Sequence, residues 1–145
     1  MRAMSLLADI NVWVPLAMSN HPRHEQVVAW FENLREGDVV YFCRATQQGF
    51  LRLITDPKLF LRAALSNEGA WRLYQDLLKD SRIEWIGEPD GMDKAWFEYA
   101  ARRSPSTKLW MDAYLAAFAR LHGLKLVSFD HAFQSYKGLD WLMPK

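Results

Sequence analysis

The chain has 145 residues, half of them apolar, and a formal net charge of only +1 at pH 7. This length suits one domain with a hydrophobic core and is too short for two ordinary ones, so residues 1–145 are expected to form a single domain. The apolar content and the seven tryptophans exclude a wholly disordered chain, while the balanced charge neither requires nor excludes a nucleic-acid partner.

Short apolar runs alternate with segments of helical periodicity. In chain order, the pattern predicts a strand at 5–8, helices at 11–19 and 22–37, a strand at 39–43, a helix at 44–55, a helical pair over 57–80, a strand at 83–87, helices at 93–103 and 107–122, a strand at 124–129 and, as a fifth strand, 139–142. Such alternation predicts parallel strands joined by right-handed crossovers. Continuous apolar strands indicate a sheet that helices cover on both faces. The predicted fold class is α/β, with a central parallel sheet of four to five strands.

Proline and glycine mark several predicted helix ends. Pro15 falls in the first turns of its helix, where a missing N–H is tolerated. Pro22 lies near the start of the next helix, and Gly37 can cap its end. Gly123 closes the long helix that precedes the fourth strand.

The cysteine content and the N-terminal residues bear on cellular location. The single cysteine, Cys43, can form neither an internal disulfide nor a Cys-rich zinc site, so a reducing cytoplasm fits best. Asp9 interrupts the first apolar run too early for a signal peptide, and no apolar stretch approaches the roughly 20 residues of a membrane span. We expect a cytoplasmic protein with no membrane partner.

Two acids follow predicted strands directly. Asp9 ends the run "LLA", and Asp130 ends the run "KLVSF". Sites in parallel sheets form beyond the carboxyl ends of the strands, so these carboxylates meet if their strands are neighbours. The alternative interpretation of each acid is a helix N-cap or a turn residue.

A third acid, Asp112, lies on the core-facing stripe of the long helix. Its neighbours at i−3, i+3 and i+4 are Leu109, Leu115 and Ala116. A carboxylate there is costly unless a cation, a metal or hydrogen-bond donors meet it. The structural alternatives to a metal are an ion pair with a residue such as Lys108 and protonation of the carboxyl.

A polar residue also heads the inner stripe of the helix 44–55. Phe50, Leu51 and Ile54 form this stripe, and one turn back lies Gln47. Its bland interpretation is a glutamine bonded to backbone. Three acids that converge would suit Mg²⁺ or Mn²⁺, which prefer oxygen ligands and keep waters that can attack a phosphodiester.

Three segments, taken in order, resemble the PIN-domain ribonucleases, and among them the VapC-type toxins of type II toxin–antitoxin systems. They are "LLADINVWVPLA", "RATQQGFLRLIT" and "STKLWMDAYLAAFARLHGLKLVSFDHAF". The resemblance covers nearly the whole chain. It implies a PIN-like α/β/α sandwich, Mg²⁺- or Mn²⁺-dependent cleavage of RNA, a homodimer, and inhibition by a small cognate antitoxin.

By this resemblance, Asp9, Asp112 and Asp130 take the positions of three family acids. The fourth position is usually Glu, and Gln47 matches it best, with Gln48 as the alternative register. A glutamine oxygen can ligate a metal or orient water without adding charge, so we expect weaker ion binding than in a four-acid site. Acids of the loop after the third strand that could compensate are Glu88, Asp90 and Asp93.

Supporting residues are predicted around these ligands. Asn11 is interpreted either as a partner of a ligand or water, or as a cap of the next helix. Thr46 and Ser128 are expected to donate hydrogen bonds to the ligands. The basic residues expected to hold RNA phosphates are Arg44, Arg52 and Lys108, with a dimer ion pair as the alternative for Arg52.

The leading hypothesis is a metal-dependent endoribonuclease toxin in which metal-activated water leaves a 5′-phosphate and a 3′-hydroxyl. A catalytically weak PIN-like module that binds RNA or a partner is the second, and it rests on Gln47. A phosphatase with Asp9 as nucleophile fits less well, because such enzymes need an acid where this chain has Asn11. Apolar side chains of the first two helices, if exposed, would form a groove for an antitoxin.

Overall fold

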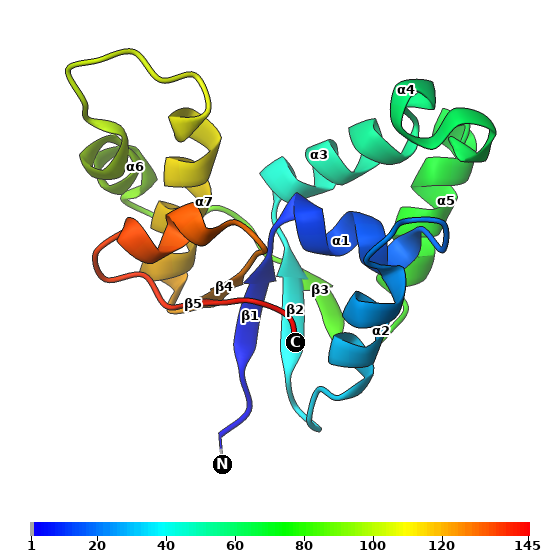
Figure 1. Cartoon of the computed structure of the whole chain (residues 1–145). Helices are drawn as coiled ribbons and strands as arrows, with labels where there is room; N and C mark the ends of the chain where they lie inside the picture. The colour runs from blue at the N-terminus through cyan, green and yellow to red at the C-terminus, as the bar shows by residue number, and fades with distance from the viewer. Residues whose placement is uncertain (1) are drawn as a thin grey trace.

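The fold is built on one sheet of five parallel strands (Figure 1). In a computed structural model that describes residues 2–145, the strands are β1 (Ser5–Ala8), β2 (Val39–Phe42), β3 (Ile83–Trp85), β4 (Lys125–Val127) and β5 (Trp141–Leu142). Their order is β3-β2-β1-β4-β5. The pairing of Ala8 with Val127 makes β1 and β4 neighbours, as the argument for Asp9 and Asp130 requires.

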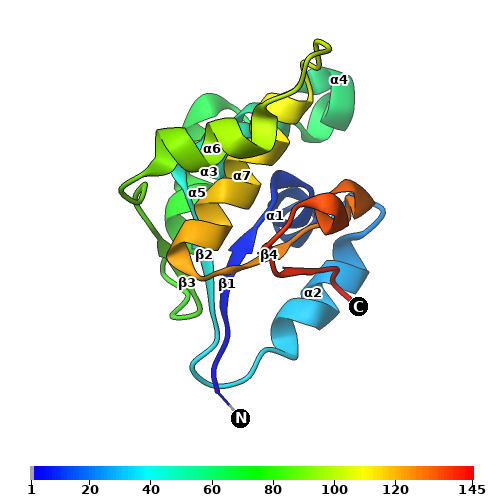
Figure 2. The ribbon, with the colours of Figure 1, turned by 90° about the vertical axis from the view of Figure 1, so that its left-hand side faces the viewer.

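Helices fill the connections between the strands. They are α1 (Ile10–Ala17), α2 (His24–Glu32), α3 (Arg44–Ile54), α4 (Pro57–Phe60), α5 (Asn67–Leu77), α6 (Met92–Ala100) and α7 (Leu109–His122), with short 3₁₀ turns η1 (Leu61–Ala63) and η2 (His131–Ser135). Figure 1 shows α1 to α5 on one side of the sheet and α6, α7 and η2 on the other, and Figure 2 shows the second group from its own side. This is the predicted α/β/α sandwich.

Each face of the sheet has its own buried core. Alternate residues of β1 enter different cores: Leu6 and Ala8 pack with α1, α2, α3 and α5, whereas Leu7 packs with α6 and α7. Because neighbouring residues in a strand point to opposite faces, a strand buried on both sides must be apolar throughout. This explains the continuous apolar runs in the sequence.

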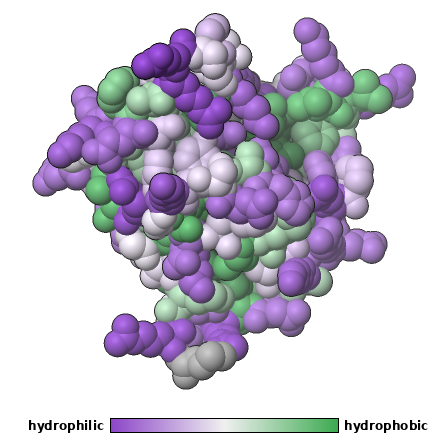
Figure 3. Space-filling view, turned by 60° about the vertical axis from the view of Figure 1, so that its left-hand side comes forward, coloured by the Kyte–Doolittle hydropathy of each residue, from purple (hydrophilic) through white to green (hydrophobic). Residues whose placement is uncertain are grey.

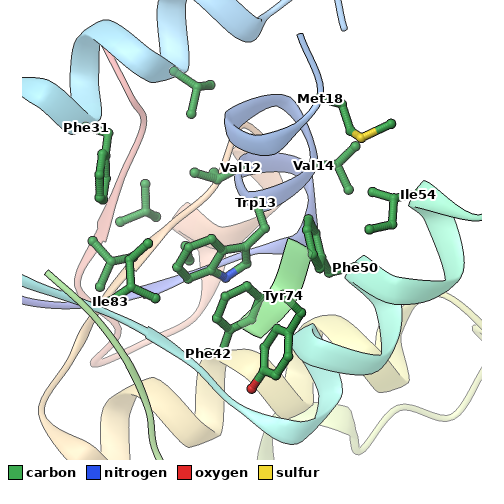
Figure 4. Packing of buried hydrophobic residues seen from close by; sticks show 14 of the residues in the cluster. Val12, Trp13, Val14, Met18, Phe31, Phe42, Phe50, Ile54, Tyr74 and Ile83 are labelled. Carbon is green, nitrogen blue, oxygen red and sulfur yellow. The ribbon is translucent and has the colours of Figure 1, made fainter. Parts of the chain in front are cut away.

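Aromatic stacking organises the first core (Figure 4). Trp13 of α1 lies flat on Phe42 of β2, with ring centroids 3.7 Å apart, and Phe50 and Tyr74 meet the edge of Phe42. Large side chains of the first two helices belong to this core, since Trp13, Val14 and Phe31 are all buried.

Several predicted boundaries are wrong by a few residues. The helix predicted over 22–37 is α2, which ends at Glu32, so Gly37 does not cap it. Gly37 instead adopts a positive φ of 91° in the turn before β2. The buried Asp38 carboxylate closes that turn by accepting the Arg35 N–H at 2.8 Å and the Met4 N–H at 2.6 Å.

Other elements hold with shorter limits. The predicted pair over 57–80 becomes α4 and α5 with η1 between them, and the last three strands are each shorter than predicted. Gly123 does cap α7, with φ of 70°. Within residues 2–145, no helix is long and apolar enough to cross a membrane.

Candidate active site

Asp9 stands where β1 gives way to α1. Its backbone N–H continues the sheet by donating to the carbonyl of Val127 at 2.9 Å, and its carboxylate caps α1 through the Ile10 N–H at 2.7 Å. The Ser128 hydroxyl donates to the other carboxylate oxygen at 2.8 Å. Burial raises the pKa of Asp9 in spite of these hydrogen bonds. Asp9 therefore performs both roles foreseen for it, a cap and a carboxylate at the sheet edge.

Asp130 follows β4 and caps η2. Its carboxylate accepts the Ala132 N–H at 2.9 Å, and the Lys108 ammonium at 3.1 Å. The Ala132 N–H is the main reason why the pKa of Asp130 lies below its ordinary value, and Lys108 adds to the effect. This acid is the most readily ionised of the three.

Asp112 reaches the same place from the first turn of α7. Burial raises the pKa of its carboxyl, and the negative charge of Asp130 raises it further. The positive charge of Lys108 partly offsets this rise in the pKa of Asp112. The pKa of Lys108 itself is raised, first by the hydrogen bond with Asp130 and then by the negative charges of the acids. The sequence predicted, as one alternative to a metal, an ion pair between Lys108 and Asp112, but in the structure Lys108 pairs with Asp130.

The three acids and Lys108 line one cavity of about 570 Å³. Three carboxylates face one ammonium group there, so the cavity carries excess negative charge that a cation would offset. Within residues 2–145, no three His, Cys, Asp or Glu side chains are gathered closely enough to hold a metal ion together. The cavity does offer carboxylate oxygens, the ligand type that Mg²⁺ prefers, and Mg²⁺ usually takes one or two carboxylates and keeps several waters.

A buried hydroxyl ties the two strand ends together. Ser128 donates to Asp9 and accepts the backbone N–H of Asp130 at 3.0 Å. The Asn11 amide donates to Ser128 at 3.2 Å and its oxygen accepts the Phe129 N–H at 3.2 Å. Asn11 is therefore a partner of a residue that holds Asp9, and the cap of α1 is Asp9 itself.

Gln47 does not line the cavity. It is buried in α3, and its Oε1 accepts a hydrogen bond from Arg44 Nη1 at 2.6 Å. The Arg44 guanidinium also lies over the ring of Trp85, 5.0 Å from its centroid. The cluster of Gln47, Arg44, Trp85 and Tyr74 is here called the α3 cluster. Burial raises the pKa of Tyr74, and the positive charge of Arg44 partly offsets this rise.

One supporting prediction for α3 needs correction. Thr46 does not serve a carboxylate: its hydroxyl accepts the Cys43 N–H at 3.0 Å and donates to the Cys43 carbonyl at 3.1 Å, which closes the first turn of α3. Arg44 contacts Gln47 and Trp85, and its predicted contact with an RNA phosphate stays a prediction. Arg52 lies in a separate hollow between α3 and α5, beside Trp71.

The alternative ligands do not line the cavity of the acids either. Gln48 is exposed on the outer side of α3, and Glu88 accepts a hydrogen bond from the Tyr114 hydroxyl at 2.6 Å. Neither Asp90 nor Asp93 lines the cavity of the acids. The structure thus brings together Asp9, Asp112, Asp130, Lys108, Asn11 and Ser128, and leaves the residues predicted on α3 outside.

Some residues at or near the cavity were not predicted from the sequence. The loop 20–22 supplies Asn20, His21 and Pro22, and the tip of α4 supplies Leu59 and Phe60. Arg23 places its guanidinium 4.0 Å from the ring centroid of Phe129, next to Ser128 and Asp130 in the chain. These residues come from segments far apart in sequence and have no spacing motif, so only the folded chain brings them to the acids.

The comparison with protein families identifies the class. The PIN domain model matches residues 6–139, and the chain belongs to this family. The Ribonuclease VapC41 of Mycobacterium tuberculosis is 45% identical over 139 residues, which are 93% of this chain and 95% of the relative. PIN ribonucleases in general depend on divalent metal ions.

Solved structures support the fold. VapBC2 from Rickettsia felis, bound to a DNA fragment from its promoter, matches with a TM-score of 0.70 over 98% of this chain and 100% of that chain, at 14% identity. The sarcin–ricin loop cleaving toxin VapC20 of Mycobacterium tuberculosis matches with a TM-score of 0.64 over 90% and 93%, at 16% identity. At these identities the likeness concerns the PIN fold alone.

Proposed function

We propose that this chain is a metal-dependent endoribonuclease toxin of the VapC type, neutralised by a cognate antitoxin. The observation that carries the proposal is the convergence of Asp9, Asp112 and Asp130 on one cavity with a single lysine. Membership of the PIN family and the 45% identical Ribonuclease VapC41 give the reaction class. A single domain over residues 1–145 fits the nearly complete overlap with that relative.

The three acids would hold Mg²⁺ or Mn²⁺, directly or through water. When bound, the ion activates a water for attack on the phosphodiester and offsets the charge that develops there. Ser128 fixes the orientation of Asp9, and Asn11 fixes Ser128. Residues that hydrogen-bond to metal ligands are commonly important, and their mutation typically lowers metal affinity or activity about 10–100-fold. The products expected are a 5′-phosphate and a 3′-hydroxyl.

Lys108 is the cation best placed to meet the RNA backbone. Its side chain is exposed and reaches Asp130 at the cavity. A phosphate contact of this kind positions a strand without reading its bases. Arg44 and Arg52 lie outside the cavity, so we assign them to more distant phosphates or, for Arg52, to a contact between two copies of the chain.

The proposed partners are RNA, a small antitoxin and a second copy of the chain, all in the cytoplasm. Apolar side chains of α1, α3 and α4 line the cavity beside the acids and include Val14, Leu53 and Leu59. An amphipathic segment of an antitoxin placed on this wall would cover the acids. Solved neighbours with antitoxins, such as the Rickettsia felis VapBC2 complex, are consistent with such a partner.

A catalytically weak module that binds RNA or a partner is the second candidate. It is favoured by one observation, the neutral Gln47, whose oxygen is bound to Arg44 where the family usually has Glu. Such a protein would still bind RNA and metal but would turn over no substrate.

Cleavage of a cellular RNA pool by the purified chain tests the proposal. The reaction is run with Mg²⁺, with Mn²⁺ and with EDTA, beside an Asp112→Asn variant and an Asp93→Asn variant as a matched exposed control. Cleavage that needs the metal, survives in Asp93→Asn and is lost in Asp112→Asn is expected. A folded wild-type protein that binds RNA and cuts none with either metal would establish the second candidate instead.

A further inference from the structure

A second hollow lies next to the acids, where the chain passes from α6 to α7. We call it the α6–α7 groove; it measures about 690 Å³ and is lined by Phe97, residues 100–107, Leu109 and Trp110. The connecting segment rises above the rest of this side in Figure 1, and residues 101–108 are all exposed. No residue of the catalytic cavity lines this groove.

Two aromatic side chains stand open in the groove. Phe97 is 64% exposed and Trp110 is 52% exposed, although large apolar side chains are normally covered. Trp110 is held in place, since the Trp96 indole N–H donates to its carbonyl at 2.9 Å and the two rings meet edge to face. The groove therefore presents an aromatic ring of fixed position.

The groove is also basic. Residues 101–108 contain Arg102, Arg103 and Lys108 and no acid, in a chain with a net charge of only +1. Within residues 2–145, neither Arg102 nor Arg103 takes part in an ion pair. Hydroxyl donors accompany them at Ser104, Ser106 and Thr107. Figure 3 views this side of the molecule, where apolar patches lie between strongly hydrophilic side chains.

The groove and the acids are joined by Lys108. This residue lies in the chain between groove residues Thr107 and Leu109, and its ammonium reaches Asp130. A polyanion with one phosphate at the acids would therefore pass Lys108 and enter the groove. Exposed aromatics beside unpaired cations are the arrangement that binds single strands, because every base has a face that can stack.

Resting on the proposed function, we propose that the α6–α7 groove binds the single-stranded RNA that flanks the scissile phosphate. Trp110 and Phe97 stack on unpaired bases, and Arg102 and Arg103 hold the phosphates between them. A duplex, whose bases are already stacked on one another, cannot use the aromatic side chains in this way. The groove thus favours substrates whose cleavage site lies in a loop or an unpaired segment.

Binding is measured in an Asp112→Asn background, so that the probe stays intact. The probe is a fluorescein-labelled single-stranded RNA of mixed sequence, about 12 nucleotides long, which covers one such site. Phe97→Ala/Trp110→Ala is expected to weaken binding about tenfold or more, and Trp110→Phe to keep most of it, because a phenyl ring still stacks. Trp71→Ala, at another tryptophan 47% exposed, is the matched control.

The cations are tested by salt dependence. Arg102→Gln/Arg103→Gln is expected to reduce the slope of log affinity against log salt by roughly 1.4, two phosphates at roughly 0.7 each on a single strand. Arg62→Gln/Arg72→Gln, at two exposed arginines elsewhere, should leave the slope unchanged. A hairpin duplex of the same composition should compete weakly with the single-stranded probe.

Unchanged affinity and slope in folded groove variants would overturn the assignment. So would a groove variant that changes the sedimenting mass of the protein while RNA binding stays the same, since the groove would then join two copies of the chain. Because binding is measured in the Asp112→Asn background, where no cleavage is expected, the test of the groove is separate from the test of the proposed function. If the groove binds the probe as described and the wild-type protein cuts no RNA, the groove stands and the nuclease assignment falls.

Discussion

The carboxyl edge of the sheet has two unlike halves. At the ends of β1 and β4, three carboxylates share one cavity with one lysine, and burial holds the pKa of Asp9 and Asp112 above the ordinary range. At the end of β2, the polar groups of the α3 cluster satisfy one another, with Gln47 bound to Arg44 and Arg44 placed over Trp85. In the first half, the negative charge of the carboxylates exceeds the positive charge of the lysine. In the second half, the polar side chains interact with one another.

The contrast separates chemistry from structure. A buried polar group whose partners lie within the protein stabilises the fold, whereas like charges held together cost free energy unless a ligand offsets them. This contrast supports the proposal that the acid half holds a cation and a substrate. We propose that the α3 cluster, which the resemblance aligns with a fourth family acid, supports the helix instead.

The largest expected effect comes from Asp112→Asn. RNA cleavage should fall more than about a hundredfold, because even second partners of metal ligands are worth about 10–100-fold. The same variant should melt at a higher temperature than wild type in EDTA, since it removes a carboxylate that is poorly solvated and repelled by Asp130. Cleavage assays and thermal melts check both parts. Loss of activity with lower stability in EDTA would mean that Asp112 is a structural residue.

Ser128→Ala should have the next largest effect. Its hydroxyl orients Asp9 and accepts the Asp130 N–H, so its loss should lower Mn²⁺ affinity about 10–100-fold. Calorimetric titration with Mn²⁺ measures this, with Ser135→Ala as the control, because the Ser135 hydroxyl donates only to the Ala132 carbonyl. Equal Mn²⁺ affinity in the two variants would show that Asp9 needs no support from Ser128.

Gln47→Glu tests the α3 cluster. The new carboxylate should pair with Arg44 and raise the free energy of unfolding by roughly 0.5–1 kcal/mol, a value reduced by the exposure of Arg44. Metal affinity should stay close to that of wild type, unlike the weaker binding expected from the sequence alone, because Arg44 already binds the side-chain oxygen of residue 47. Chemical denaturation and Mn²⁺ titration measure the two quantities. Tighter Mn²⁺ binding by Gln47→Glu would instead favour a fourth ligand at this position, and Arg44→Gln/Gln47→Glu would show whether Arg44 withholds it.

The smallest effect concerns pH in the absence of metal. A carboxyl whose native pKa is raised holds its proton longer in the folded state, so the stability it contributes is complete below its usual pKa of 3.8 and is lost as pH rises through the native value. The stability gained by Asp112→Asn over wild type should therefore grow between about pH 3 and about pH 7. Denaturation in EDTA across this range measures the difference; a difference that shrinks with pH would contradict the raised pKa.

The sequence alone predicted the parts of the site that follow from the regular geometry of strands and helices. Strand ends in a parallel sheet meet at one edge, which placed Asp9 beside Asp130, and the helical stripe pointed Asp112 inward. Gln47 shows the limit of this reasoning. Gln47 was predicted to lie on the inner stripe of α3, and it is buried. Its hydrogen-bond partner is Arg44, one turn earlier, which the pattern of apolar residues does not predict.

The remaining contributions depend on tertiary contacts. The loop 20–22 and the tip of α4 line the cavity because the helices that carry them pack against the first core. The turn before β2 likewise depends on a contact between distant residues, since the Asp38 carboxylate accepts the Met4 N–H. Single-sequence periodicity carries no information about such contacts.

Anomalous diffraction from crystals of the wild-type chain soaked in Mn²⁺ tests the central claim most directly. A peak is expected in the cavity between Asp9, Asp112 and Asp130, with one or two carboxylates as direct ligands, waters completing the sphere, and Gln47 still bound to Arg44. A peak in the α3 cluster, or crystals of active protein that hold their Mn²⁺ away from these three acids, would contradict the account.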